Sequence, residues 1–190
     1  SSVRCSAVAD SSTLDTDPTR PYFSQFGGET DNDTIIAVAT PVVPQAGGIA
    51  IIRLSGDQAV PIVQKLFRAK GKDGENVDWK VKSHMARYGT LVDAGGKLLD
   101  EALVLPMLKP RSYTREDVVE LHCHGGNICS RRVLAACVEL GARPAQPGEF
   151  TLRAFLAGRI DLAQAESVEQ LIAARTSAAA DGALSALRGE

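Results

Sequence analysis

The sequence has no long hydrophobic run, few cysteines and almost no net charge. None of its apolar stretches approaches the ~18 consecutive residues that suggest a membrane-spanning helix. Its 21 basic and 23 acidic residues give a formal net charge of −2. The chain as a whole therefore has no strong attraction for nucleic acid, and any RNA contact would need a local basic patch or another domain. The four cysteines form no CxxC pair, which favours free thiols in a reducing compartment.

The glycine patterns that bind nucleotide phosphates are also missing. The segment QAGGIAIIRLSG at 45–56 matches neither GxGxxG nor GxxxxGK[ST], and no other segment does. We therefore expect no GTP hydrolysis by these 190 residues alone. The chain begins without Met and ends inside a helical pattern, so we expect it to be a fragment containing one domain and part of a second.

Residues 1–30 are rich in Ser, Thr and Asp and have little hydrophobic periodicity. Such a composition buries too little surface to offset the entropy lost on ordering, which predicts a disordered tail. The first residues, SSVRCSAVA, fit the remnant of an organelle transit peptide. The acidic residues Asp10, Asp15 and Asp17 argue against a transit peptide over the whole segment, and a mature N-terminal tail is the alternative.

Residues 31–148 predict a mixed α+β domain. Strands are expected at 33–40, 49–56, 87–93, 101–107 and 117–124, with a hairpin turn at Gly95–Gly96 and a surface loop at 70–80. Helices are expected at 57–67, with Ser55 as its N-cap, and at 127–140, ending at Gly141. Strands and helices do not alternate regularly, which favours an α+β mixed sheet over a doubly wound one.

Residues 149–190 are rich in Ala and Leu and predict the start of an all-α domain. Gly158 and Asp161 divide the segment into a short helix and a longer one that Asp161 caps, and a third helix is expected over 176–187. The second helix has one apolar stripe: Leu162, Ala165, Val168, Leu171 and Ile172. We expect this stripe to pack on helices downstream or on a second subunit.

The heptapeptide ELHCHGG at 120–126 contains atoms that bind metals, but its spacing does not favour a metal site. Side chains alternate between the two faces of a strand, so Cys123 lies opposite to His122 and His124. No second pair of ligands has zinc-site spacing, and we expect no metal. The same alternation argues against a thiolate–imidazole pair, and Cys123, Cys129 and Cys137 are interpreted as core residues.

Glu120 shares its face with the two histidines, inside an otherwise apolar strand. A lone carboxylate is costly in such a place, so Glu120 needs a partner. The partner is either a basic side chain such as Arg53, or a ligand with two adjacent N–H donors, such as a pterin or guanine edge. Arg53, and Arg159 between the two predicted helices, could each bind an anionic ligand tail, with solvent exposure as the alternative.

Several long blocks, in the same order, resemble the N-terminal region of the MnmE (TrmE) family of tRNA-modification GTPases. The blocks are DNDTIIAVATP at 31–41, GIAIIRLSG at 48–56, SYTREDVVELHCHGG at 112–126, PGEFTLRAFLAGRIDLAQAE at 147–166 and ALSALRG at 183–189. The resemblance runs from about Asp31 to the end of the chain.

This resemblance implies a folate-binding, homodimerising α+β domain at 31–148, similar to the folate domains of aminomethyltransferases. A helical domain starts at 149, and a G domain that binds GTP with Mg²⁺ and K⁺ is inserted within it, outside this fragment. With an MnmG-type partner that uses FAD and NADH, the full protein modifies carbon 5 of the tRNA wobble uridine. The one-carbon unit comes from 5-formyltetrahydrofolate or 5,10-methylenetetrahydrofolate.

The family's folate contacts correspond to three residues of this sequence. Arg53 matches the basic residue of the GI-x-I-x-R-x-SG strand, and Glu120 matches the glutamate of the EDV-x-EL block. Arg159 stands where bacterial members often have Lys, and Lys and Arg differ in reach and hydrogen-bond geometry.

The family resemblance leaves two questions open. The alternative to a part of a tRNA-modification GTPase is a free-standing folate-dependent one-carbon transferase without a G domain. A dimerisation module without folate binding is a third reading.

The N-terminal tail implies an imported protein, in a plastid rather than a mitochondrion, whereas a bacterial member would be cytoplasmic. No membrane association is expected.

Overall fold

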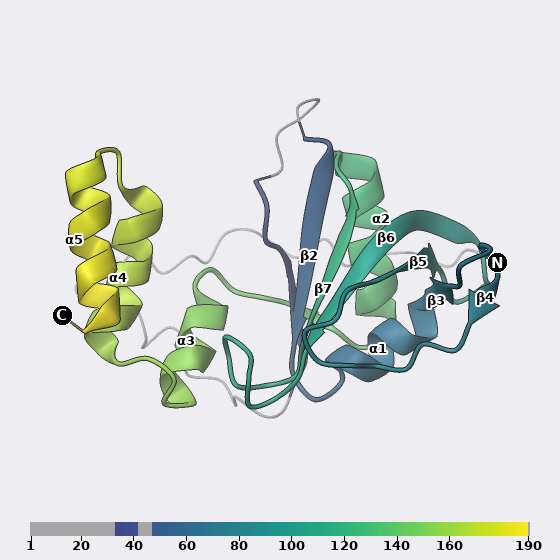
Figure 1. Ribbon diagram of the computed structural model, residues 1–190, viewed down its shortest axis with the longest axis horizontal. Coiled ribbons are helices and arrows are strands. Elements are labelled where there is room, and N and C mark those ends of the chain that lie inside the picture. The colour runs from purple at the N-terminus through teal and green to yellow at the C-terminus, as the bar shows by residue number, and fades with distance from the viewer. Residues whose placement is uncertain (1–32, 42–46, 190) are drawn as a thin grey trace, which may run out of the picture. The chain divides into compact units, whose positions relative to one another are not determined.

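The computed structural model describes residues 33–41 and 47–189 (Figure 1). The predicted tail at 1–30, with Cys5, lies outside the described residues. No helix in the described part is long and apolar enough to cross a membrane. The boundary expected at residue 149 stays a prediction.

The described strands form one mixed sheet in the order β4-β3-β5-β6-β7-β2-β1-β8. They are β1 (Ile35–Val38), β2 (Ile49–Ser55), β3 (Phe67–Lys70), β4 (Asn76–Val77), β5 (Arg87–Val92), β6 (Leu98–Met107), β7 (Val118–His124) and β8 (Arg143–Pro144). Every neighbouring pair is antiparallel except β1 and β8, which run parallel. The expected α+β class with a mixed sheet is confirmed, and β5 and β6 form the predicted hairpin.

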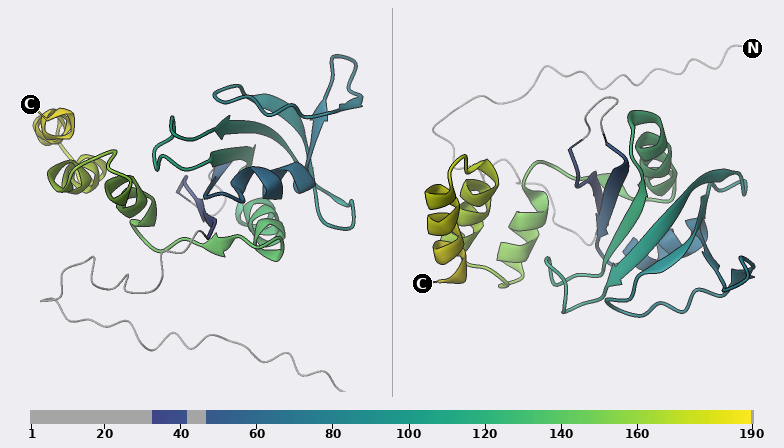
Figure 2. Two further views of the ribbon diagram at one scale, coloured as in Figure 1. Left: turned by 90° about the horizontal axis from the view of Figure 1, so that it is seen from below. Right: turned by 45° about the horizontal axis from the view of Figure 1, so that its top comes forward.

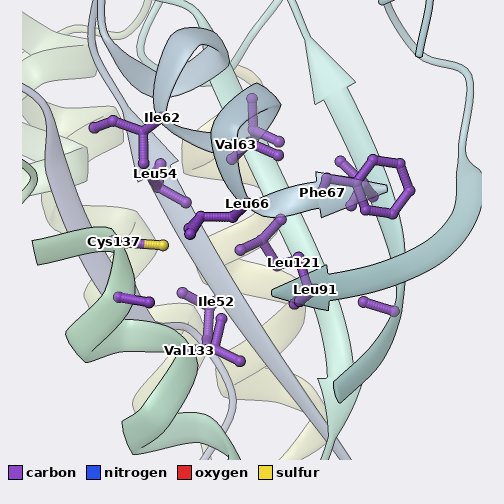
Figure 3. Close-up of a cluster of buried hydrophobic side chains, with 14 of the residues drawn as sticks. Ile52, Leu54, Ile62, Val63, Leu66, Phe67, Leu91, Leu121, Val133 and Cys137 are labelled. Atoms are coloured by element: carbon purple, nitrogen blue, oxygen red, sulfur yellow. The ribbon is translucent and has the colours of Figure 1, made fainter. Parts of the chain in front are cut away.

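Two helices, α1 (Ala59–Leu66) and α2 (Asn127–Glu139), lie against one sheet face (Figure 2). They bury the apolar side chains of that face (Figure 3). Along β2 and β7 every second residue points into this core, as the alternation of strand side chains requires. The core members drawn and labelled in Figure 3 are Ile52, Leu54, Ile62, Val63, Leu66, Phe67, Leu91, Leu121, Val133 and Cys137. Burying each large aliphatic side chain stabilises the fold by about 1.5–3 kcal/mol.

Two local predictions are wrong. Ser55 does not cap the first helix, because its hydroxyl bonds Thr114 and Glu116 across the end of the sheet. The cap position is Gln58, whose backbone N–H donates to the Thr34 hydroxyl instead. The polar segment 70–80 is not wholly a loop, since it contains β4 and the last residue of β3.

The C-terminal segment forms three helices, α3 (Glu149–Leu156), α4 (Leu162–Ala173) and α5 (Ser177–Arg188). Asp161 caps α4 as predicted, in a reciprocal capping box with Gln164. The helices α4 and α5 lie side by side (Figures 1 and 2). The predicted stripe on α4 is only partly buried: Ala165 is covered, whereas Ile172 is 82% exposed.

Candidate functional site

The face of the sheet opposite the core carries the polar residues singled out in the sequence. The register of β2 and β7 places Arg53 directly opposite Glu120, and Ile51 opposite His122. On the other side of β7, Leu105 of β6 lies opposite Glu120. Arg53 and Glu120 therefore come together on the face that α1 and α2 leave uncovered, as alternation predicted.

The side chain of Glu120 is only 12% exposed, and two neighbouring side chains, Arg53 and His122, bond its carboxylate. Both Nε and Nη2 of Arg53 lie 2.8 Å from Oε1 of Glu120. His122 Nε2 lies 3.1 Å from the other carboxylate oxygen, Oε2. The expectation that this carboxylate needs a partner is confirmed, and Arg53 is that partner.

The helix α3 supplies one wall of this site. The Arg53 guanidinium lies 5.7 Å from the centre of the Phe150 ring, a cation–π distance. The Tyr113 hydroxyl is 3.1 Å from the Thr151 hydroxyl, which ties α3 to the segment between β6 and β7. The position of Phe150 over Arg53 therefore depends on how α3 is attached to the end of the sheet.

A network of ion pairs makes that attachment. Arg143 of β8 bonds Asp33 and Glu149, and Arg153 of α3 bonds Asp33, Glu149 and Glu116. Hydrogen bonds from Arg143 and Arg153 hold the pKa of Asp33 below its usual 3.8. Burial alone would raise the pKa of Glu149, but bonds from Arg143 and the Gln146 backbone N–H outweigh burial and lower it below 4.5. The same Glu149 contact raises the pKa of Arg143.

Arg159 lies elsewhere on the surface, in the link between α3 and α4. It lines a hollow of about 720 Å³ whose other walls come from the end of β6, the segment after it and His84, which lies between β4 and β5. The structure therefore brings Arg53 and Glu120 into contact, whereas within the described part Arg159 bonds neither of them. The assignment of all three to folate stays a prediction.

The remaining residues of the heptapeptide have structural partners. His124 bonds Asp100, whose carboxylate raises the histidine's pKa. Burial raises the pKa of the Cys123 thiol to about 11, so it is protonated at neutral pH. A Cβ on Gly125 would stand 1.9 Å from the Gly47 carbonyl oxygen. The backbone after β7 therefore passes too close to the segment before β2 for any side chain at position 125. Among the described residues, no group of three or more His, Cys, Asp or Glu could hold a metal ion.

Sequence reasoning missed Phe150 and the network that holds α3. The available signal was the charge order in 143–153, where Glu149 stands between Arg143 and Arg153. Nothing in the sequence pairs Asp33 with residues 110 and 120 positions further along the chain.

A family model described as "GTP-binding protein TrmE N-terminus" matches residues 34–159. The chain belongs to the TrmE N-terminal family. The matched region contains both strands that carry Arg53 and Glu120, the whole of α3, and Arg159 as its last residue. The predicted family is thereby confirmed.

Curated relatives in cyanobacteria carry the name "tRNA modification GTPase MnmE". The protein from Synechococcus elongatus and that from Thermosynechococcus vestitus are each 58% identical over 160 residues, covering 84% of this chain. The Nostoc relative is 54% identical over 158 residues. The chain spans about a third of the length of these relatives, since the aligned part is 33% of the first two.

Proposed function

We propose that this chain is the folate-binding, homodimerising N-terminal part of a tRNA-modification GTPase. The family membership supports the assignment to such a protein. The arrangement of Glu120, Arg53 and Phe150 on the uncovered sheet face supports folate as the ligand. A free-standing one-carbon transferase is the alternative, and the name GTPase carried by relatives more than half identical to this chain favours the first reading.

The carboxylate of Glu120 is the observation on which the folate assignment depends. A pterin presents two adjacent N–H donors, and a carboxylate accepts two parallel hydrogen bonds in a fork. Glu120 is a buried carboxylate on the uncovered face of β2 and β7, and Phe150 offers an aromatic ring beside its partner Arg53. A flat, two-pronged donor fits these two groups together.

Binding a pterin requires the existing partners of Glu120 to make room. An ionised carboxylate has about four acceptor positions. Arg53 takes two contacts on Oε1 and His122 takes one on Oε2. Both positions on Oε1 are therefore taken and one position on Oε2 is free, so a donor that needs both oxygens displaces one of the two Arg53 contacts. Arg53 keeps its other contact and remains the ion-pair partner of Glu120.

Titration of the full-length protein with 5-formyltetrahydrofolate tests this assignment. Glu120→Gln keeps the size of the side chain but turns one acceptor oxygen into a donor. Loss of a charge-assisted pair costs about 1.5–3 kcal/mol, so we expect affinity to fall roughly ten- to a hundredfold. Glu139→Gln is the matched control, because Glu139 is exposed on α2 on the core side of the sheet, and it should bind normally. A folded wild-type protein that binds no folate would refute the proposal.

The wider activity is proposed from the family. The full protein would hydrolyse GTP with Mg²⁺ and K⁺ in a G domain and, with an MnmG-type FAD partner, modify carbon 5 of the wobble uridine. The folate bound at Glu120 would supply the one-carbon unit. Because the relatives are cyanobacterial, a plastid location is favoured over a mitochondrial one. A fluorescent fusion of the native protein that accumulates in mitochondria would contradict this location.

A further inference from the structure

The hollow that contains Arg159 is cationic and has no acidic residue in its lining. It is formed by His84, Met107, Pro110, Arg111, Ser112, Tyr113, Arg115 and Arg159. The arginines come from two separate parts of the chain, the segment between β6 and β7 and the link between α3 and α4. Three guanidiniums around one hollow repel one another, weakly where solvent screens them, and an anion between them would turn this repulsion into attraction. This arrangement points to an anionic ligand with more than one charge.

These arginines differ from the other arginines of the site in their partners. Arg53, Arg143 and Arg153 are each paired with a carboxylate. The Arg115 side chain instead donates to the backbone oxygen of Ala157 at 3.2 Å, and in the described part the side chains of Arg111 and Arg159 make no hydrogen bond or ion pair. All three are exposed. Their charges are therefore available to a ligand without breaking an existing ion pair.

The backbone of the hollow is strained at two positions. His84 and Arg115, each with φ of 61°, are the residues other than glycine with positive φ in the described part of the chain. Both line this hollow. Such a conformation costs of order 1–3 kcal/mol for a residue with a side chain, and this kind of strain concentrates at ligand sites. This observation is independent of the charge and marks the same surface.

The hollow lies on the same sheet face as Glu120. Met107 in its lining and Leu105 opposite Glu120 are two residues apart on β6, which is roughly 6.7 Å along the strand. Met107, Pro110 and Tyr113 give the hollow an apolar wall, and the arginines stand around it. One elongated ligand can therefore have a flat hydrogen-bonding head at Glu120 and a negatively charged tail in the hollow.

We propose that this hollow binds the oligo-γ-glutamyl tail of a folate, so that the protein prefers polyglutamylated folates over the monoglutamate. The proposal rests on the proposed folate function. Each added γ-glutamyl unit brings one carboxylate, and a guanidinium binds a carboxylate through two parallel N–H bonds. The p-aminobenzoyl ring between head and tail would lie on the apolar wall. Arg111 and Arg115 would hold the tail beyond the first glutamate.

The test compares 5-formyltetrahydrofolate monoglutamate with the triglutamate on the full-length protein. Exposed ion pairs contribute little each, about 0.2–1 kcal/mol. We therefore expect the triglutamate to bind about tenfold more tightly, with a steeper loss of affinity as salt rises. In the double variant Arg111→Gln/Arg115→Gln this ratio should fall to about threefold or less, by the same conversion. Arg131→Gln is the control, because Arg131 is exposed on α2, which packs on the other sheet face.

The outcomes separate this inference from the folate assignment. Equal affinity of the wild-type protein for both folates would overturn the tail site and leave the folate function standing. Failure to bind either folate would overturn both. A third measurement uses tRNA: if the double variant loses tRNA binding but keeps the wild-type preference for triglutamate, the hollow binds a phosphate backbone and the inference is wrong. A circular dichroism spectrum like that of the wild type shows that each variant is folded.

Discussion

At the scale of single residues, the alternation of side chains along a strand predicted on which sheet face most residues of the site lie. It placed Glu120, His122 and His124 on one face and Cys123 on the other, and the register of β2 and β7 confirms this. Pairing between Glu120 and Arg53 was predictable because a carboxylate inside an apolar strand needs a cation. That Phe150 lies beside Arg53 was not predictable, since nothing local sets the position of α3 on the sheet.

The three described cysteines provide a test of their predicted core positions. Burial raises the pKa of Cys123 to about 11 and that of Cys137 to about 12. Both therefore remain protonated at about pH 8, where an ordinary cysteine, with a pKa of about 8.5, is partly ionised. Cys129 on α2 is only partly buried, against the expectation that all three lie in the core. With iodoacetamide in the native state we expect Cys129 to be alkylated well before Cys123 and Cys137.

Peptide mass spectrometry over a time course measures this order. The same reagent in denaturant provides the control, because there the three thiols should react at similar rates. Native labelling of Cys137 as fast as Cys129 would show that α2 does not cover the sheet as described.

At the scale of elements, the sequence predicted five of the described strands and all five described helices, and it missed the short strands β3, β4 and β8. β2, β5, β6, β7, α2, α4 and α5 follow from apolar periodicity, turn residues and caps. β3 follows α1 without a break, so the sequence FRAK at 67–70 shows no boundary between helix and strand. Ser55 has the type of an N-cap residue, yet the segment 112–117 offers its hydroxyl Thr114 and Glu116 instead. Tertiary partners of this kind have no signature within a short window.

The attachment of α3 predicts a pH-dependent stability. Asp33 and Glu149 have lowered pKa values in the folded chain, so their ion pairs stabilise it fully above their ordinary values of 3.8 and 4.5. The contribution is lost as the pH falls through the lower folded-state values. Arg143→Gln removes the main partner of both carboxylates. Because Arg143 is 41% exposed, we expect the free energy of unfolding at neutral pH to fall by only about 1–2 kcal/mol.

Urea unfolding of both proteins across the acid range checks the sign. The difference between wild type and Arg143→Gln should be largest near neutrality and should shrink as the pH falls below the ordinary carboxyl pKa values of 4.5 and 3.8. Arg131→Gln, on an exposed helix surface, should show little difference at any pH. A wild-type advantage that grows on acidification would contradict the ion-pair account.

At the scale of the whole molecule, one sheet face is covered by its own helices and the other is not. The cross-strand row Tyr88–Leu103–His122–Ile51 lies on the uncovered face, and Tyr88 and Leu103 are 47% and 46% exposed. Ile49, in line with His124, is 66% exposed. Large apolar side chains gathered beside a binding site mark a surface that another chain covers. The proposed homodimer gives these side chains a partner and places the proposed folate site next to the interface.

The uncovered row therefore predicts which substitutions separate the two subunits. Leu103→Asp puts a carboxylate into the apolar interface, where it has no partner and is costly to bury. We expect the dimer dissociation constant, measured by analytical ultracentrifugation of the full-length protein, to rise at least about tenfold, or about 1.4 kcal/mol. Ile128→Asp makes the same chemical change at a 75% exposed residue of α2, on the other sheet face, and should leave the dimer intact. If Ile128→Asp separates the subunits and Leu103→Asp does not, the interface lies on the helical side of the sheet. Folate affinity measured in parallel shows whether the proposed folate site needs the second subunit. If it does, Leu103→Asp weakens folate binding even though Glu120 and Arg53 are unchanged.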